Sequence, residues 1–369
     1  MSNRGQTPPW LRWWIAVFAL LFAAAAAARV ASIVAADDDA AITKGVIFHS
    51  HWPALYPSDA VRADVLDKVA AAGVTALRVD SAWDEFEPTR RGEWNEAYGR
   101  VMDKTVELAH ARGLKVLIML WRTPAWARPR GTDDSYPPTD AGDFAAFAHV
   151  LAARYRKKLA GIEIWNEPDR HQQYFHVLPT QDRYVELARL TRATKAALAG
   201  TGVATVMPGA SSIDDEYYTA LFDRGGLTAD DYDIANVHSY QGAADEPPDH
   251  PDDGERWWLS HLPALFHVLA AHGDSSKPVW ITEHGYSTNA NAPATPPFER
   301  GVSEATQAQY LKQSFSYVRK RRWSRVKAIY WYNEIDVCDD AFDNQCRFGL
   351  LRRDRTAKPA LAAMRSVHE

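Results

Sequence analysis

A chain of 369 residues, of which 46% are hydrophobic and 24% charged, has the composition of an ordinary globular protein. Its formal net charge of −5 argues against nucleic acid as a partner, because phosphate binding needs a basic surface. Most of the 14 Trp and 15 Tyr residues are expected in the core, although such rings also form surfaces on which sugars stack.

The first 40 residues are expected to lie outside the folded domain. Two Arg residues precede an uncharged run from Trp13 to Ala28, and small residues follow it, an order that is typical of an export signal. The run is shorter than the roughly 20 residues of a spanning helix, but Arg29 could reach the interface and leave an uncleaved anchor. The sequence therefore predicts a signal peptide or membrane anchor at 1–40 and an exported domain at 41–369, secreted or membrane-anchored and facing outside the cytoplasm.

From residue 43 onward, short β-branched apolar segments alternate with segments of helical period. Several helical segments end on Gly, as helix C-caps do, and no Gly-rich dinucleotide fingerprint follows any strand. Strands buried on both faces and alternating with helices imply a parallel sheet, so eight such units predict an α/β fold with a single (β/α)8 TIM barrel. The predicted strands are 44–52, 74–80, 114–121, 161–167, 204–210, 232–240, 278–285 and 326–333.

The predicted connections are asymmetric in length. Segments that lead from a helix into a strand are short, whereas four that leave a strand are long and rich in Pro, Asp, Trp and Tyr: 122–142, 168–181, 241–254 and 286–303. In a (β/α)8 barrel all strand-to-helix loops lie on one face, where active sites are found. The loop lengths therefore predict a binding cleft on that face.

Two carboxylates end strands that face each other across the predicted barrel. Glu167 ends the fourth strand and is held by Pro168, and Glu283 ends the seventh. Such a pair is the minimum for glycoside hydrolysis, in which one carboxyl protonates the leaving oxygen and the other attacks or activates water. Polar and aromatic side chains end neighbouring strands, and the expected substrate-binding residues are Arg78, Asn166, His238, Tyr240 and Trp331.

The sequence also resembles a known family. "WNEP" at 165–168, Glu283, and "FEPTRRGEWNEAYGRVMDKTVELAHARGLKVLIML" followed by "TPAWA" are similar to clan A of the retaining glycoside hydrolases. The resemblance spans residues 44–369 and is closest to family 39, including its bacterial exopolysaccharide-cleaving members, with family 5 next. It implies a catalytic glycosidase domain at 41–369. The long loops over the barrel mouth favour an open groove, and hence an oligo- or polysaccharide substrate.

Residue roles follow from the resemblance. It implies Glu167 as general acid/base and Glu283 as nucleophile, with Asn166 bonded to the sugar 2-hydroxyl. Arg78 and Tyr240 would orient Glu283 or keep it ionised, while His238 and Trp331 would line the central subsite. The sequence departs from family 5 at Trp121, where that family places a His nearby, and this departure leaves the substrate open.

Further aromatic and acidic residues surround these positions. Trp52, Trp121, Trp126 and Tyr286 are candidate subsite residues, and His49 is a candidate at the end of the first strand. Glu163 lies an even number of residues before Glu167, so the two side chains share a face of the strand. A buried structural acid is expected there, without an assigned role.

Two other functions remain open from the sequence. His49 and His51 in "HSH" have the spacing of paired ligands in metal-dependent amidohydrolase barrels, and His238 and Asp336 would extend such a site. That ligand set is incomplete, because the fifth strand ends without His and the fourth has no bridging Lys. A barrel that binds polysaccharide without cleaving it is the other alternative. We expect no cofactor, no metal and a monomer.

Only two cysteines are present, Cys338 and Cys346, eight residues apart. In an exported protein, two nearby thiols without others predict one local disulfide that holds a loop. Two thiolates are half of a structural zinc set, which disfavours a metal site.

Overall fold

The computed structural model describes residues 41–367, which include the whole predicted barrel. Residues 42–368 group as one compact unit. The signal or anchor predicted at 1–40 lies outside the described residues. Within the described part of the chain, no helix is both long and apolar enough to cross a membrane.

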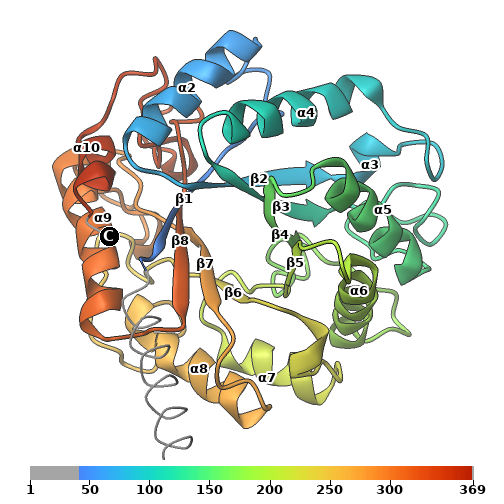
Figure 1. The fold of residues 1–369 in the computed structure, drawn as a ribbon. Helices are drawn as coiled ribbons and strands as arrows, with labels where there is room; N and C mark the ends of the chain where they lie inside the picture. The colour runs from blue at the N-terminus through green and yellow to red at the C-terminus, as the bar shows by residue number, and fades with distance from the viewer. Residues whose placement is uncertain (1–40, 368–369) are drawn as a thin grey trace, which may run out of the picture. The chain divides into compact units, whose positions relative to one another are not determined.

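Eight parallel strands form the centre of the domain (Figure 1). They pair in the order β5-β4-β3-β2-β1-β8-β7-β6. One parallel bridge joins Val206 of β5 to Ile234, the residue just before β6, and so connects the two ends of that order. The prediction of a (β/α)8 barrel is therefore confirmed. The strands are β1 (Thr43–Ile47), β2 (Ala76–Ala82), β3 (Lys115–Trp121), β4 (Leu159–Ile164), β5 (Ala204–Val206), β6 (Ala235–His238), β7 (Val279–His284) and β8 (Val326–Trp331).

Helices surround the strands as a ring (Figure 1). Most begin at a Ser, Asp or Asn whose side chain accepts a hydrogen bond from a first-turn N–H, as in Asn95 and Asp182. The α-helices are α2 (Asp59–Ala71), α3 (Trp83–Phe86), α4 (Glu96–His110), α5 (Ala141–Arg154), α6 (Arg183–Leu198), α7 (Asp215–Asp223), α8 (Leu262–Ala271), α9 (Glu304–Lys320) and α10 (Pro359–Ser366). Short 3-10 helices lie at η1 (Ala229–Asp231), η2 (Leu259–His261), η3 (Pro297–Glu299) and η4 (Asn344–Cys346).

The core is divided by the barrel wall into two clusters. Inside the strands, a small cluster includes Ala76, Leu117, Ala328 and Tyr330, and outside them a large cluster fills the space below the helices. Tyr330 lies against Gly45 of β1, its register partner, where a Cβ would come within 2.2 Å of the Tyr330 ring. Successive residues of each strand therefore face either the barrel axis or the helices.

Several predicted strands end earlier in the structure than the sequence predicts. β4 ends at Ile164 rather than residue 167 and β6 at His238 rather than residue 240, so Glu167 and Tyr240 follow their strands instead of ending them. The difference is largest for β1 and β5. β1 ends at Ile47 rather than residue 52, and β5 ends at Val206 rather than residue 210. Pro208 has no N–H to donate to a sheet, which explains why the β5 segment leaves it. The polar residues after these strands accordingly lie on loops.

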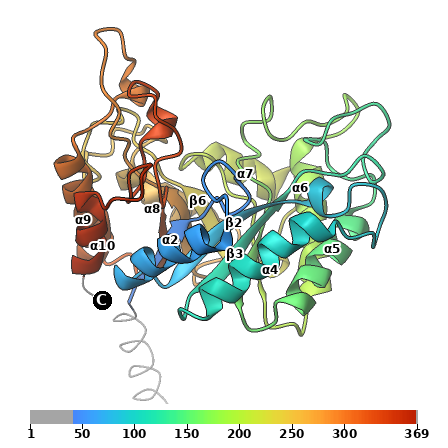
Figure 2. The same ribbon diagram turned by 90° about the horizontal axis from the view of Figure 1, so that it is seen from above.

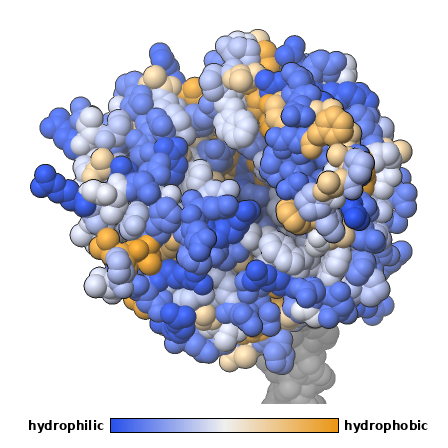
Figure 3. Space-filling model, turned by 180° about the vertical axis from the view of Figure 1, so that it is seen from behind, coloured by the Kyte–Doolittle hydropathy of each residue, from blue (hydrophilic) through white to orange (hydrophobic). Residues whose placement is uncertain are grey.

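Long loops leave the carboxyl ends of several strands and extend from one side of the barrel (Figure 2). They span 122–140 after β3, 165–182 after β4, 285–303 after β7 and 332–358 after β8, whereas the segments entering β2, β3 and β4 are about one turn long. Seen from behind the view of Figure 1, the molecule is hollowed near its centre, with walls that are mostly hydrophilic or intermediate in hydropathy (Figure 3). The predicted asymmetry of the loops is confirmed.

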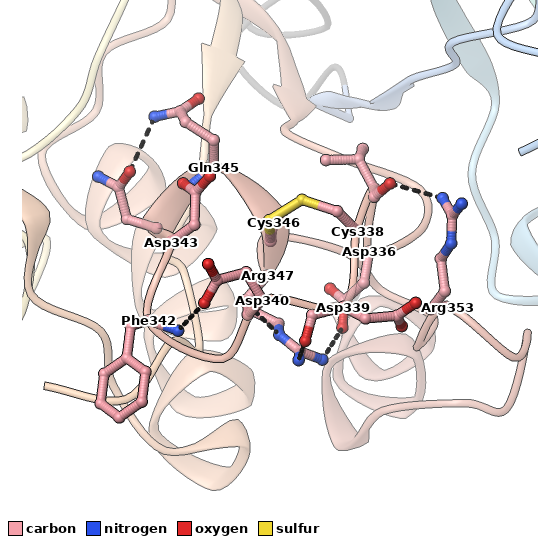
Figure 4. The surroundings of a disulfide bond; sticks show 12 residues. Asp336, Cys338, Asp339, Asp340, Phe342, Asp343, Gln345, Cys346, Arg347 and Arg353 are labelled. Atoms are coloured by element: carbon pink, nitrogen blue, oxygen red, sulfur yellow. Dashed lines mark hydrogen bonds and ion pairs between the residues drawn. A yellow bond between two sulfur atoms is a disulfide. The ribbon is translucent and has the colours of Figure 1, made fainter. Parts of the chain in front are cut away.

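The predicted disulfide joins Cys338 and Cys346 in the loop after β8 (Figure 4). Arg347 donates hydrogen bonds to the backbone oxygens of Asp339 and Asp340 within the same loop. Arg353 donates to the backbone oxygen of Val337. The covalent bond and these hydrogen bonds together hold an otherwise irregular segment close to the end of β8.

Candidate active site

Arg78 of β2 connects the polar side chains at the barrel mouth. Its guanidinium donates to both oxygens of Glu163, at 2.7 and 2.9 Å, to Glu283 Oε1 at 2.7 Å and to Asn166 Oδ1 at 3.0 Å. The side chain is buried, so each of these charge-assisted bonds acts in a medium of low polarity. Arg78 thereby joins residues from β2, β4 and β7, as the sequence predicted for the strand ends.

Glu163 is the main counter-ion of Arg78, a role that the sequence analysis did not assign. It is buried on β4, and its contacts also include the Thr282 hydroxyl at 3.4 Å and His238 Nε2 at 3.8 Å. Burial alone would raise the pKa of Glu163, but the charge and hydrogen bonds of Arg78 and His238 lower it to about 2. Glu163 is therefore an ionised structural acid beneath the mouth.

Glu283 of β7 accepts two hydrogen bonds from groups that do not give up their protons. Arg78 Nη1 donates to Oε1 at 2.7 Å, and the Tyr240 hydroxyl donates to Oε2 at 2.7 Å. Burial, and then the charge of Glu283, raise the pKa of Tyr240 well above its usual value, so this phenol remains a donor. Both carboxylate oxygens of Glu283 are thus held in place by hydrogen-bond donors.

Glu167 lies just after β4 on a backbone of unusual conformation. Its φ is +42° and that of Trp165 is +65°, in the left-handed region that side chains with a Cβ rarely adopt. The Trp165 indole donates to the backbone oxygen of Tyr174 and holds this turn in place. Such strain at a side chain that faces a cleft is typical of functional positions.

His238 lies between the acidic groups. Its Nδ1 is 2.8 Å from Glu167 Oε1 and 3.6 Å from Glu283 Oε2, while its Nε2 faces Glu163. Burial opposes the charged ring, but Glu283 and hydrogen bonds with Glu163 and Glu167 raise the pKa of His238 to about 10. At neutral pH the imidazolium donates to Glu167 and neutralises part of the charge of the carboxylates.

The separation of the two predicted acids distinguishes between the two kinds of glycosidase. One ligand-type atom each of Glu167, His238 and Glu283 lies within 4.8 Å of the others, so carboxyl oxygens of the two glutamates are at most that far apart. Retaining enzymes hold their carboxyl groups about 5–5.5 Å apart, whereas inverting enzymes leave about 6.5–9.5 Å for a water. The spacing here is typical of the retaining kind.

A row of aromatic rings runs outward from Glu283. Ring centroids are 6.4 Å apart for Tyr240 and Tyr332, 5.6 Å for Tyr332 and His49, and 4.4 Å for His49 and Trp52. Trp52 is 40% exposed. The row begins at the residue that donates to Glu283 and ends in solvent, as a surface for stacking sugars would.

Trp331, predicted to line the central subsite, does not reach it. Its side chain is 0% exposed and packs against His284 and Tyr286 in the outer cluster, because this position of β8 faces the helices. Tyr332 faces the mouth instead and was missed. The signal was present in the sequence, since Tyr332 has the same parity as Tyr330, whereas Trp331 has the opposite one.

Other aromatic candidates divide between mouth and core. Trp121 is partly exposed at the end of β3, with its ring centroid 6.1 Å from that of Tyr174. Trp126 is partly buried, donates to the backbone oxygen of Glu87 and packs edge-on against Trp83. Tyr286 is buried in the core, so its prediction as a subsite residue is wrong.

The alternative metal site at His49 and His51 does not assemble. His49 Nδ1 is bonded to Glu334 Oε2 at 3.2 Å, while His51 is stacked on Tyr98 and its Nε2 faces the Tyr98 carbonyl. Burial lowers the pKa of His51 to about 4. In residues 41–367, neither of the two groups with metal-ligand geometry contains His49 or His51. The remaining candidate, Asp336, is bonded to Lys358 at 2.7 Å.

Comparison with known proteins agrees with this geometry. The family model described as cellulase, glycosyl hydrolase family 5, matches residues 36–335. A search of curated protein sequences gives no significant match.

Solved structures share the fold at low sequence identity. A family 39 glycoside hydrolase from the gut symbiont Bacteroides cellulosilyticus WH2 has a TM-score of 0.66 and 23% identity over 90% of this chain and 64% of that one. A GH5_18 protein from Streptomyces cattleya, solved in complex with GlcNAc, has a TM-score of 0.65 and 20% identity over 89% and 80%. The exo-β-1,4-mannosidase Op5Man5 from Opitutaceae bacterium strain TAV5 has a TM-score of 0.59 and 16% identity, over 89% of this chain and 59% of that one.

The prediction of a clan A retaining glycoside hydrolase is thus confirmed. The family model that matches is that of family 5, which the sequence resemblance ranked after family 39. The chain spans 64% of the length of the family 39 structure, so it corresponds to part of that protein. Because the model matches most of the chain, this protein belongs to glycoside hydrolase family 5, the cellulase family.

Proposed function

We propose that Glu283 is the nucleophile and Glu167 the general acid/base of a double displacement on an oligo- or polysaccharide outside the cytoplasm. The observation that carries this assignment is the distance of at most 4.8 Å between carboxyl oxygens of the two residues. That distance leaves room for a sugar carbon between them and no room for an intervening water.

The unequal surroundings of the two carboxyls support the division of roles. Glu283 accepts from Arg78 on one oxygen and from Tyr240 on the other, and these two bonds orient the carboxylate for attack on the anomeric carbon. Glu167 shares its hydrogen bond with the His238 imidazolium, a group that can pass on a proton. Glu167 then donates that proton to the departing glycosidic oxygen.

The second step uses the same residues in reverse. Once Glu283 is esterified by the sugar, its negative charge is gone, and repulsion no longer opposes an ionised Glu167. Glu167 removes a proton from water as the water attacks the anomeric carbon, and Glu283 leaves as a carboxylate. The configuration of the sugar is retained because each step inverts it.

The binding residues divide into two sides of the mouth. On the Glu283 side, the row Tyr240, Tyr332, His49 and Trp52 supports binding of the sugar that becomes attached to the enzyme. Beyond Glu167, Arg170 lies 3.6 Å from Glu167 Oε2 and above the Tyr174 ring, which in turn contacts Trp121. These residues support contacts with the leaving group.

The site of action is proposed from the sequence of residues 1–40, whose charged, apolar and small-residue segments have the order of an export signal. Export would give the enzyme access to polysaccharides outside the cytoplasm. Fractionation of cells that express the full chain would test it, and activity confined to the cytoplasm would contradict it.

Azide rescue of two truncated variants tests the assignment of roles. Glu283→Ala should lose at least about 1000-fold in kcat/KM on p-nitrophenyl β-glycosides, because it lacks the attacking group. Glu167→Ala should instead lose at least about 1000-fold in kcat, because p-nitrophenolate leaves without a proton but hydrolysis of the glycosyl-enzyme still needs a base. Azide should then restore turnover in both. Glu283→Ala should yield the α-glycosyl azide, because azide attacks in place of the nucleophile. Glu167→Ala should yield the β-glycosyl azide, because azide attacks the glycosyl-enzyme.

The control is Glu246→Ala, which removes an acid from the loop after β6 and should leave kcat/KM unchanged. Assays should begin with β-1,4-linked gluco- and manno-oligosaccharides, since the family model is named for cellulase and one structural neighbour is an exo-β-1,4-mannosidase. Exchanged azide products, or near-normal turnover in either variant, would remove that residue from its role.

A further inference from the structure

Asp80 is an acidic residue at the mouth that the catalytic scheme does not use. On β2, Ala76 belongs to the inner cluster and Arg78 bonds Glu283, so Asp80 points the same way, one step nearer the mouth. Val79, between them, belongs to the outer cluster. The side chain of Asp80 therefore faces the substrate cleft rather than the helices.

The carboxylate of Asp80 has no hydrogen-bond partner within residues 41–367. Its Oδ1 is buried, unlike the oxygens of an ordinary surface acid. An unpaired buried oxygen of this kind costs free energy unless a ligand group bonds to it. On the next strand, the indole N–H of Trp121 is also buried without a partner, and it too lies on an inward-facing residue at the mouth. One acceptor and one donor are thus available above the barrel.

The surroundings of Asp80 lie on the side of the nucleophile. Strands β2, β1, β8 and β7 are consecutive in the barrel. Asp80 lies on β2 and Glu283 on β7, while His49 and Tyr332 lie on the loops directly after β1 and β8. Burial and the charges of Glu283, Glu334 and Asp80 raise the pKa of Tyr332. The negative charges of Glu334, Asp80 and Glu283 outweigh burial and raise the pKa of His49. Asp80 is therefore near the row of rings that begins at Glu283.

This arc of the mouth holds three acids. Glu283 is neutralised by Arg78, and Glu334 accepts from the His49 backbone N–H at 2.9 Å, from His49 Nδ1 and from the Tyr56 hydroxyl at 2.7 Å. Asp80 has no such partner. An anionic group bound here would meet the like charges of Asp80 and Glu334, while the nearby guanidinium of Arg78 is already bonded to Glu163 and Glu283. Hydroxyl groups would instead supply the donors that Asp80 lacks.

We propose that Asp80 determines specificity on the glycone side, accepting hydrogen bonds from hydroxyls of a neutral sugar and excluding sugars that carry a carboxylate. The inference rests on the proposed roles of Glu283 and Glu167, because these define which side holds the glycone. It makes no change to the chemical steps. A neutral hexose or pentose glycone is the substrate class it assigns.

Aryl glycosides that differ only in the glycone test this proposal. The probes are the p-nitrophenyl β-glycosides of glucose, mannose, galactose, xylose, cellobiose and glucuronic acid, so the leaving group stays constant. The wild-type enzyme should cleave a neutral member fastest and the glucuronide slowest. Asp80→Asn should lower kcat/KM on that neutral glycoside about 10- to 100-fold, the range expected for loss of charged hydrogen bonds.

The ratio of kcat/KM between two glycosides distinguishes a sugar-binding role of Asp80 from a purely structural one. In Asp80→Asn the ratio of kcat/KM for the glucuronide to that for the neutral glycoside should rise, while the melting temperature stays the same. Asp64→Asn on α2, which removes an equal charge from the exterior, should leave both ratio and rate unchanged. Equal losses on every glycone, or a wild-type preference for the glucuronide, would overturn the proposal.

The wild-type preference needs no variant, so the proposal stays testable even if Asp80→Asn does not fold. Its failure is distinct from failure of the catalytic assignment. The azide products identify the nucleophile and the acid whatever the sugar, whereas the change of glycone preference in Asp80→Asn reports on Asp80.

Discussion

At the scale of single residues, the centre of this site is an ordered set of charges. Arg78 lies between Glu163 and Glu283, and His238 lies between Glu163, Glu167 and Glu283, so two cations face three acids in a buried space. Removing one partner of such a set leaves a buried charge without compensation, which is costly. Each of these side chains is therefore expected to affect both stability and rate.

Tyr240→Phe isolates one hydrogen bond to Glu283. The variant should lower kcat/KM about 10- to 100-fold, because a bond to a charged acceptor contributes about 1.5–3 kcal/mol. Melting temperature should change little, since the ring stays in place. Tyr310→Phe, which removes a hydroxyl bonded to the neutral backbone oxygen of Asp245, is the matched control. A loss as large in the control as in Tyr240→Phe would show that the effect is not specific to Glu283.

The pH dependence of stability should report His238. Its pKa is raised from about 6.5 to about 10 in the folded protein, so its contribution is full below pH 6.5 and lost as the pH rises toward 10. The free energy of unfolding, measured by denaturant titration, should fall over this interval in the wild type. In His238→Gln, which does not titrate, the fall should be shallower. Parallel profiles would contradict the assignment.

Acid has the opposite effect through Glu163. Its pKa is lowered from 4.5 to about 2, so the stability it contributes is present above pH 4.5 and is lost as the pH falls toward 2. The two groups together predict a stability maximum between about pH 4.5 and 6.5 from these contributions.

At the scale of elements, the strands place the site by their parity and their ends. Arg78 lies on an inward position of β2. Glu283 has the parity of Ile281, which faces the helices, and reaches the mouth because the register of β7 shifts between them. Glu167 follows β4 after the left-handed Trp165 and is itself left-handed. The inner cluster below must be filled for these positions to be held. Gly45 and Tyr330 show this most directly. The absence of a side chain at Gly45 of β1 leaves the space that the Tyr330 ring of β8 fills.

Gly45→Ala should destabilise the fold by about 1–3 kcal/mol, because the added Cβ would overlap the Tyr330 ring. Unfolding by denaturant measures this change. Tyr330→Leu in the same chain should relieve most of it, so the double variant should be more stable than the sum of the two single changes predicts. Additive effects would indicate that the close approach does not determine the cost.

At the scale of the whole molecule, the compact unit of residues 42–368 contains every residue assigned to the site. Deleting 1–40 should therefore leave kcat/KM within about twofold of that of the full chain on the same aryl glycoside. Export of the truncated chain from the expressing cell should be lost. A truncated protein that is folded but inactive would show that the N-terminal segment contributes to the site.

The sequence by itself determined the repeating strands and helices, the barrel, the long loops of one face, both carboxylates and the disulfide. These follow from local rules: periodicity sets element type, and strand ends in a parallel barrel share one face. It also indicated the glycosidase family through "WNEP" and Glu283.

Only the tertiary structure decided which aromatic side chains reach the mouth and which acids are paired. Trp331 and Tyr332 are neighbours in sequence, yet one faces the helices and the other the cleft. Glu163 and Asp80 are both acids on inward strand positions, but Arg78 neutralises the first and leaves the second for a ligand. Such differences depend on distances between strands far apart in the chain, which local patterns do not contain.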